Sequence, residues 1–275
     1  MALDLGDPPS PTDHQWYRFW AEYTAAQARN TRQPTKVIDL RVRRMFHDLC
    51  RMLEPTVVLE LGAHEGRFSK WAKRTFPDAR CLALEANPYV HREHREDMDE
   101  IGVEYRHLAA AATNATVTIN IPTRIGNKVK DRANRMASLG VHHRAVGHES
   151  VDVEAVRVDD IVDLTDDDRV VAWIDVEGAS DAVLGGSEEL MARADAVYIE
   201  VEDREVWEGQ WLDVDVAAFF RTLGKFPAMR DIQRLHSYNV VFISPDLAGR
   251  DGVAERAARV LRPPRGGKSE DEKAD

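Results

Sequence analysis

The amino-acid sequence predicts an α/β protein built on a Rossmann-like, doubly wound and mostly parallel sheet. From residue 56 onward, short apolar runs of strand length alternate with segments of helical periodicity, which is the pattern of parallel strands joined by crossover helices. A glycine-containing turn joins the first of these runs to the helix that follows it. Near the carboxyl end, two runs at residues 225–230 and 238–243 are close enough to form a β-hairpin, which predicts an antiparallel closing strand.

Two helices are expected before the sheet, over residues 14–30 and 37–53. Apolar side chains recur at helical spacing in the second of them: Val37, Leu40, Val42, Met45, Leu49, Met52 and Leu53. Pro55 ends this helix, because proline lacks the N–H group that a helix interior needs. We therefore expect residues 1–55 to form an N-terminal helical cap on a core of residues 56–261.

The core is expected to alternate strands and helices in chain order. Strands are predicted at residues 57–61, 80–84, 103–107, 170–174 and 196–201, and helices at residues 67–76, 89–99, 187–193 and 214–223. Residues 115–121 alternate in polarity and predict an antiparallel or edge strand, and residues 150–158 predict another strand. The polar stretch between them, residues 122–150, is expected to be an irregular insertion. The Pro-, Gly- and charge-rich tail over residues 262–275 predicts disorder.

Charge and composition argue against several classes of function. The formal net charge is −11, with 37 Lys and Arg against 48 Asp and Glu, which disfavours general binding to nucleic acids or anionic membranes. No run approaches the ~18 apolar residues of a membrane span, and the first residues do not have the pattern of a secretory signal. Cys50 and Cys81 have no metal-ligand spacing and are expected to be buried, reduced thiols. We expect a cytoplasmic protein.

The turn after the first strand reads ELGAHEG over residues 60–66. Gly62 and Gly66 allow a sharp backbone turn and a close approach to a ligand. The unpaired N–H groups at the start of the next helix suit a polar or anionic group such as a carboxylate. The spacing G-x-x-x-G differs from the G-x-G-x-x-G of dinucleotide-binding proteins, which argues against a nicotinamide cofactor. Alternatively, a glycine turn between a strand and a helix can have no role in ligand binding.

Two further motifs lie at the ends of predicted strands. Glu85 ends the second strand, where a carboxylate suits two vicinal ribose hydroxyls through charge-assisted hydrogen bonds of ~1.5–3 kcal/mol. The alternative for Glu85 is a solvated carboxylate at a strand end. The third motif, WIDVEGA over residues 173–179, follows another buried strand. All three motifs therefore fall where open α/β sheets bind ligands.

Together, LELGAHEGRFS, LEANP and WIDVEGA resemble the motifs of the FkbM-type methyltransferases, from about residue 57 to residue 242. The resemblance implies a class I methyltransferase fold, S-adenosyl-L-methionine as the cofactor, and O-methylation of a hydroxyl group on a sugar or small natural product. His64, Glu65 and Ser180 depart from this pattern, because Asn, an apolar residue and Glu are common at the corresponding places in the family.

The resemblance also implies which residues contact the cofactor: Glu60, Gly62, Ala63, His64, Gly66, Phe68, Ser69, Glu85, Ala86, Asn87 and Asp175. Asp175 and Glu177 follow a central strand, so we expect Asp175 near the methyl-transfer centre and Glu177 close to it, as catalytic residues. Glu177 could instead only cap the glycine turn that follows. His236, just before the last strand, is a candidate general base, although an isolated histidine is more often structural or exposed.

Candidate contacts to the methyl acceptor lie mostly outside the three motifs: Arg135, Ser138, Glu200 and Trp207. Residues 122–148 are strongly basic and could form a lid over an anionic acceptor, or a solvated insertion. Trp207 could wall the acceptor pocket together with Trp211, or it could only pack. Asp175, Glu177 and Glu200 could together bind a divalent cation. The resemblance calls for no metal, and none is expected.

Other classes of function stay open on the sequence alone. One is a non-catalytic cofactor- or ligand-binding module on the same fold, for which the departures at His64, Glu65 and Ser180 leave room. A nucleotide-dependent oxidoreductase is disfavoured by the missing G-x-G-x-x-G motif. The expected partner is a small-molecule hydroxyl acceptor. No nucleic acid and no membrane is expected as a partner, and a homo-oligomer is compatible with the sequence.

Overall fold

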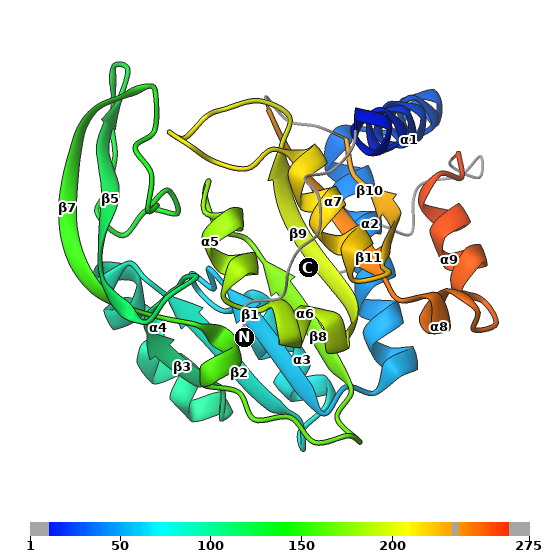
Figure 1. Ribbon diagram of the computed structural model, residues 1–275, viewed down its shortest axis with the longest axis horizontal. Coiled ribbons are helices and arrows are strands. Elements are labelled where there is room, and N and C mark those ends of the chain that lie inside the picture. Colours follow the sequence, from blue (N-terminus) through cyan, green and yellow to red (C-terminus); the bar gives the residue numbers. More distant parts are fainter. Residues whose placement is uncertain (1–10, 233–235, 264–275) are drawn as a thin grey trace.

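A computed structural model of the chain describes residues 11–232 and 236–263. Its centre is a seven-stranded sheet in the order β10-β11-β9-β8-β1-β2-β3 (Figure 1). The strands are β1 (Val57–Leu61), β2 (Arg80–Glu85), β3 (Glu104–His107), β8 (Val170–Ile174), β9 (Ala194–Glu202), β10 (Phe226–Arg230) and β11 (Ser237–Ile243). β11 runs antiparallel to both β9 and β10, whereas the pairs among the other strands are parallel. The predicted doubly wound sheet with an antiparallel closing strand is confirmed.

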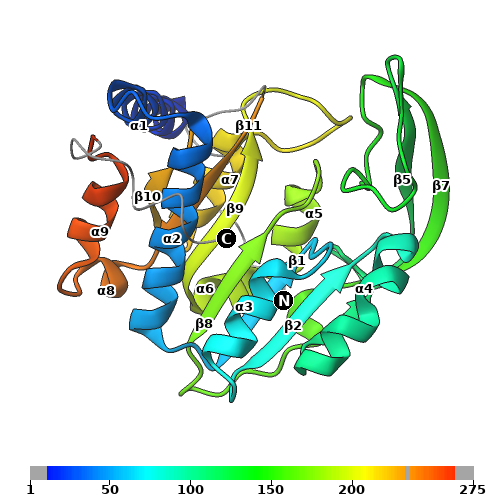
Figure 2. The same ribbon diagram turned by 180° about the vertical axis from the view of Figure 1, so that it is seen from behind.

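Helices cover both faces of this sheet (Figures 1 and 2). One face carries α2 (Thr35–Leu53), α3 (Arg67–Thr75), α4 (Pro88–Ile101) and α9 (Val253–Val260). The other carries α5 (Ser180–Gly185), α6 (Glu188–Arg193) and α7 (Asp213–Thr222). The remaining helices are α1 (Pro11–Asn30), which packs against α7 and β10, the short α8 (Pro245–Ala248), and a single 3-10 turn, Val158–Asp160.

The two faces bury separate cores because side chains alternate along each strand. Leu59 and Leu61 of β1 point into the core beneath α5, α6 and α7, which also contains Tyr17 of α1. Val58 points into the opposite core, which is shared with α2, α3, α4 and α9. The N-terminal helices thus pack into the same cores as the sheet, while a domain boundary at residue 55 stays a prediction.

A second sheet of four strands, in the order β4-β7-β5-β6, stands on the β3 side of the molecule (Figure 1). Its strands are β4 (Ala109–Ala110), β5 (Ala115–Ile125), β6 (Lys128–Val129) and β7 (Ala145–Val156). β5 and β7 form a long antiparallel ribbon, so the expected irregular structure of residues 122–150 is wrong at both ends of that stretch. The outer part of this ribbon, residues 123–125 and 145–149, extends away from the core and leaves both of its faces partly exposed, so it lacks the apolar alternation that marks a half-buried strand.

The chain after β11 adds two helices that the sequence pattern did not indicate. α9 follows α8 and buries Val253 and Val260 in the core that it shares with α2. The tail predicted to be disordered, residues 262–275, lies outside the described residues except for its first two positions. No helix in the described part of the chain is long and apolar enough to cross a membrane.

Candidate functional site

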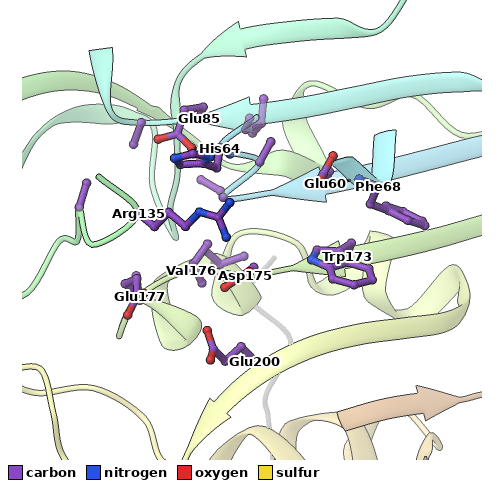
Figure 3. A pocket seen from close by; sticks show the side chains of 18 of the residues that line it. Glu60, His64, Phe68, Glu85, Arg135, Trp173, Asp175, Val176, Glu177 and Glu200 are labelled. Carbon is purple, nitrogen blue, oxygen red and sulfur yellow. Dashed lines mark hydrogen bonds between the residues drawn. The ribbon is translucent and has the colours of Figure 1, made fainter. Parts of the chain in front are cut away.

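A cavity of about 460 Å³ opens where β1, β2, β8 and β9 end (Figure 3). Parallel strands share one carboxyl edge, so motifs that are distant in the sequence meet there. The predicted site residues that line the cavity are Glu60, Gly62, Ala63, His64, Phe68, Glu85, Ala86, Arg135, Ser138, Asp175, Glu177 and Glu200. The structure therefore brings all three sequence motifs to one place.

Two glycines shape the turn between β1 and α3. Gly62 has a φ of +77°, and a Cβ atom there would lie 2.1 Å from the carbonyl oxygen of Asp175. Gly66 has a φ of +65°, and its Cβ atom would lie 2.2 Å from Cε of Met98 in α4. Glycine is required at both positions because the turn packs against the end of β8 and against α4. Close packing within the protein already requires glycine at both positions; Gly62 also lines the cavity, whereas Gly66 does not.

The first amides of α3 are already bound within the protein. The backbone N–H groups of Phe68 and Ser69 donate to the carboxylate of Glu60, at 3.2 and 2.8 Å. Burial raises the pKa of Glu60 to about 7, although these hydrogen bonds favour the ionised form. The start of α3 therefore holds the chain's own carboxylate instead of the external one that the sequence suggested. Ser69 lies outside the cavity lining.

Glu85 forms a buried part of the cavity wall. Its carboxylate accepts hydrogen bonds from the backbone N–H groups of His64 at 2.8 Å and Asn87 at 2.7 Å. Burial raises the pKa of Glu85 to about 7, against the effect of these hydrogen bonds. The residue is 8% exposed, so it is not a solvated carboxylate at a strand end. Each carboxylate oxygen keeps a second lone pair that can accept a hydrogen bond from a hydroxyl group of a ligand.

Asn87 does not line the cavity; its side chain forms hydrogen bonds that hold a segment at the rim of the cavity. Its side chain accepts from the backbone N–H of Tyr89, which caps α4, and donates to the carbonyl oxygens of Arg132 and Asn134 at 2.8 and 3.2 Å. These bonds hold residues 130–140, here called the strap. The strap also contributes Ser138, whose hydroxyl donates to the carbonyl oxygen of Glu177. The strap therefore connects the start of α4 to the segment that follows β8.

Carboxylates gather where β8 and β9 end. Asp175 follows β8, Glu200 lies near the end of β9, and both line the cavity (Figure 3). Burial, then the neighbouring Asp175, raises the pKa of Glu177 to about 8 and holds the pKa of Glu200 well above its usual value. The same causes raise the pKa of Glu202 to about 7. Several of these carboxyl groups therefore hold protons near neutral pH. Within the described ranges, no cluster of His, Cys, Asp or Glu side chains is arranged to hold a metal ion.

Trp207 and His236 do not line the cavity. Trp207 is fully buried, and a Cβ atom on Gly178 would lie 2.3 Å from its indole ring. Trp207 thus packs beneath the glycine turn that follows β8. The Nδ1 atom of His236 lies 3.7 Å from Oδ1 of Asp203. The cavity gives no support to an acceptor contact at Trp207 or to a general base at His236.

Two arginines of the basic stretch, residues 122–148, pair with acidic neighbours. Arg132 lies 2.8 Å from Glu149, and Arg135 lies 2.8 Å from Glu65 on the rim of the cavity. Glu65 also pairs with Arg67. These pairs reduce the positive field that an anionic acceptor would meet, so an anionic acceptor stays a prediction that the geometry does not strengthen.

Sequence reasoning missed one side of the cavity. The residues there come from α2, β8 and the β10–β11 hairpin: Asp39, Arg43, His47, Trp173, Asp231, Ile232, Ser237, Tyr238 and Asn239. Asp39, Arg43 and His47 are four residues apart, which places them on one helix face. The spacing of these three polar residues is visible in the sequence. The apolar residues alone were enough to predict the helix, so its polar face gave no separate signal of a site.

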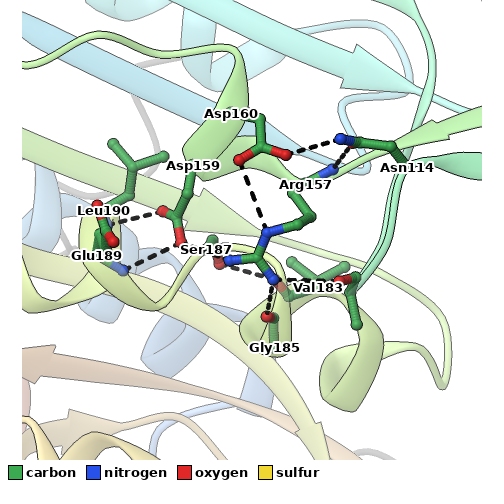
Figure 4. A network of polar contacts seen from close by, with 10 residues as sticks. Asn114, Arg157, Asp159, Asp160, Val183, Gly185, Ser187, Glu189 and Leu190 are labelled. Atoms are coloured by element: carbon green, nitrogen blue, oxygen red, sulfur yellow. Dashed lines mark hydrogen bonds and ion pairs between the residues drawn. The ribbon is translucent and has the colours of Figure 1, made fainter. Parts of the chain in front are cut away.

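Arg157 ties the β5–β7 ribbon to the helices beneath the cavity (Figure 4). Its guanidinium donates to the carbonyl oxygens of Ala112 and Gly185, at 3.1 and 3.0 Å. Gly185 ends α5, the helix that follows the third motif. Asp159 accepts from the first backbone amides of α6, at 3.2 and 3.0 Å. Arg157 and Asp159 therefore join the ribbon, α5 and α6 into one network.

The strand order, the reversed β11 and a cavity at the carboxyl ends of β1 and β2 define a class I methyltransferase fold. A sequence model described as the methyltransferase FkbM domain matches residues 60–239, which is more than half of the chain. The chain therefore belongs to the FkbM methyltransferase family, and the resemblance identified from its motifs is confirmed.

One curated relative is the 2-O-methyltransferase NoeI of Sinorhizobium fredii (strain NBRC 101917 / NGR234), 24% identical over 210 residues that cover 73% of this chain and 85% of that protein. Among solved structures, the methyltransferase FkbM from Methylobacillus flagellatus KT aligns with a TM-score of 0.47 and 10% identity, over 69% of this chain and 44% of that chain. The 1,6-didemethyltoxoflavin-N1-methyltransferase of Burkholderia thailandensis, solved with S-adenosylhomocysteine, aligns with a TM-score of 0.39 and 13% identity, over 87% and 93%.

Replacing Arg157 with alanine is expected to lower the free energy of unfolding by about 1–3 kcal/mol, because the carbonyl oxygens of Ala112 and Gly185 lose their donor. Urea denaturation followed by circular dichroism measures this change. Arg259→Ala, which removes a surface pair with Glu255 within α9, is the matched control and should change stability little. Equal effects of the two substitutions would contradict the role given to Arg157.

The raised pKa of Glu177 predicts a pH-dependent difference between the wild type and Glu177→Gln. A carboxyl whose pKa is higher in the folded state than in the unfolded state stabilises the fold below its unfolded pKa and loses that effect as pH rises through its folded pKa. Between pH 5 and pH 8–9 the variant should therefore gain stability relative to the wild type, by about 1 kcal/mol or more.

Urea midpoints at the two pH values test this expectation for Glu177. The control is Glu208→Gln on the exposed loop after Trp207, for which the difference from the wild type should not change with pH. A Glu177→Gln variant that instead loses stability as pH rises would mean that the ionised carboxylate is the form that the fold favours.

Proposed function

We propose that the protein is an S-adenosyl-L-methionine-dependent methyltransferase that methylates a hydroxyl group of a sugar or small natural product. The observation that carries this proposal is the single cavity in which Glu85, the β1–α3 turn and Asp175 meet. Membership in the FkbM family supports the cofactor, and the 2-O-methyltransferase activity in the name of the NoeI relative supports an oxygen acceptor.

The residues of the cavity fit this cofactor. The buried Glu85 carboxylate has lone pairs free for two ribose hydroxyls, each through a charge-assisted hydrogen bond. The Nδ1 atom of His64 is buried and has no hydrogen-bond partner, although His64 lines the cavity. An unpaired polar atom of this kind is costly unless a ligand satisfies it. Ala63 and Ala86 complete this wall with small side chains.

The cofactor supplies an electrophilic methyl group on a sulfonium sulfur. Asp175 lies between the cofactor wall and the Glu177–Glu200 side of the cavity, so its carboxylate can align the acceptor hydroxyl with the methyl group (Figure 3). Glu177 is suited to accept the hydroxyl proton in its ionised form, whose share grows as pH rises toward its pKa of about 8 and which is a stronger base than an ordinary glutamate. Arg135, Ser138 and Glu200 would contact the acceptor.

The partner that we propose is a small molecule, not a nucleic acid or a membrane. The cavity is about 460 Å³, a size typical of sites for small ligands. Its lining is rich in carboxylates, which repel a phosphate backbone. The two cysteines are free thiols, which supports a cytoplasmic location.

Binding of S-adenosylhomocysteine tests the cofactor. Isothermal titration calorimetry should detect binding by the wild type, and Glu85→Gln should weaken it by about tenfold or more, because the ribose loses an ionised acceptor. Glu104→Gln, at an exposed position of β3, is the matched control and should bind like the wild type. A folded wild type that does not bind this ligand would exclude the proposed function.

Turnover separates an enzyme from a binding module on the same fold. Mass spectrometry of sugars and hydroxylated natural products incubated with protein and cofactor should detect an acceptor that gains one methyl group. Asp175→Asn should abolish this product while S-adenosylhomocysteine still binds. Binding of the cofactor without any methylated product across such acceptors and a host extract would favour the binding module.

A further inference from the structure

Arg43 of α2 is the least exposed of the arginines that line the cavity. Three arginines in the described residues line the cavity: Arg43, Arg67 and Arg135. The side chains of Arg67 and Arg135 are 72% and 61% exposed, and both pair with Glu65 on the rim. The Arg43 side chain is 40% exposed and comes from the helix that covers the sheet. Arg43 is therefore the arginine that a ligand inside the cavity would meet.

Neighbouring side chains hold the Arg43 guanidinium in place. Its Nε atom donates to Oδ1 of the buried Asp39 at 3.0 Å. Its central carbon lies 5.7 Å from the centre of the Trp173 ring. Because the bond to Asp39 uses Nε, the two Nη groups stay available to bind a carboxylate end on, through two parallel N–H donors. An arginine oriented in this way is preorganised for an anionic group.

The start of α3 could also bind an anion, but the Glu60 carboxylate already occupies it. Helix starts commonly bind anions through their free amides, but the Phe68 and Ser69 amides of α3 donate to Glu60. Glu60 and Asp175 add negative charge on this side of the cavity. A ligand that carries both a carboxylate and an ammonium group finds a cation in Arg43 and acidic side chains beside it.

The spacing between the two ends of the cavity suits an extended ligand. Trp173 lies on β8 and Glu85 ends β2, and both strands flank β1. Two strand spacings put β8 and β2 about 10 Å apart. A ligand with its ribose at Glu85 can thus extend across β1 toward Trp173 and Arg43.

We propose that Arg43 of α2 binds the carboxylate of the cofactor's amino-acid end, with Asp39 as the residue that positions the guanidinium. This inference rests on the proposed function, since it assigns a further contact in the same site. α2 lies before residues 60–239, the part of the chain that matches the family. The contact therefore comes from a segment that the family match does not include.

Calorimetry with two ligands tests the role of Arg43. S-Adenosylhomocysteine carries the amino-acid carboxylate, whereas 5′-methylthioadenosine keeps the adenosine and the thioether and lacks the amino acid. Arg43→Ala should weaken binding of S-adenosylhomocysteine tenfold or more and change binding of 5′-methylthioadenosine less than twofold. Arg43→Lys should recover only part of the lost affinity, because it restores the charge and not the planar pair of donors.

The control is Lys36→Ala, which removes an exposed cation from the start of the same helix and should leave both affinities unchanged. Equal losses for the two ligands would show that Arg43 supports the shape of the cavity instead of a carboxylate. An unchanged affinity of Arg43→Ala for S-adenosylhomocysteine, or no recovery in Arg43→Lys, would overturn the proposal. A wild type that binds neither ligand would remove the proposed function itself, which is a different result.

Discussion

The hydrogen bonds between the Glu60 carboxylate and the first amides of α3 are the interaction on which the site depends. A helix that starts at a buried sheet edge must satisfy its free amides. Glu60, at the end of β1, does so from within the fold, and the turn between them is held on both sides by Gly62 and Gly66. The loop is therefore shaped by the protein alone, and a ligand meets a preformed wall.

The same edge concentrates acidic side chains in a poorly solvated place. Glu60, Asp175 and Glu200 end three adjacent strands, β1, β8 and β9, so the topology itself brings them together. Burial disfavours their ionised forms, and each charge disfavours the next. Burial first, and the neighbouring Asp175 charge after it, raise the pKa values of Glu60 and Glu177. A positively charged ligand would relieve it, which is consistent with a sulfonium cofactor.

The sequence was sufficient to predict the elements whose signals are local. β8, and β1 apart from Glu60, are apolar runs because both of their faces are covered, and Glu85 and Asp175 could be predicted from their places at strand ends. The inner part of the β5–β7 ribbon was predicted, but its outer part, residues 123–125 and 145–149, could not be, since it leaves both faces partly exposed and lacks apolar alternation. The place of Arg43 in the cavity depends on how α2 packs over β8, a contact that no local pattern encodes.

Charge patterns in the sequence do not show which basic side chains have an acidic partner in the fold. The basic stretch looked like an anion-binding lid, but Arg132 pairs with Glu149 across the ribbon, and Arg135 pairs with Glu65, 70 positions away in the chain. A charge run has a field of its own only where folding keeps its counter-charges distant. Arg43 differs, because the fold places it in the cavity wall beside Asp39 and Trp173. Which side chains recognise charge is therefore decided by long-range packing, not by the local density of basic residues.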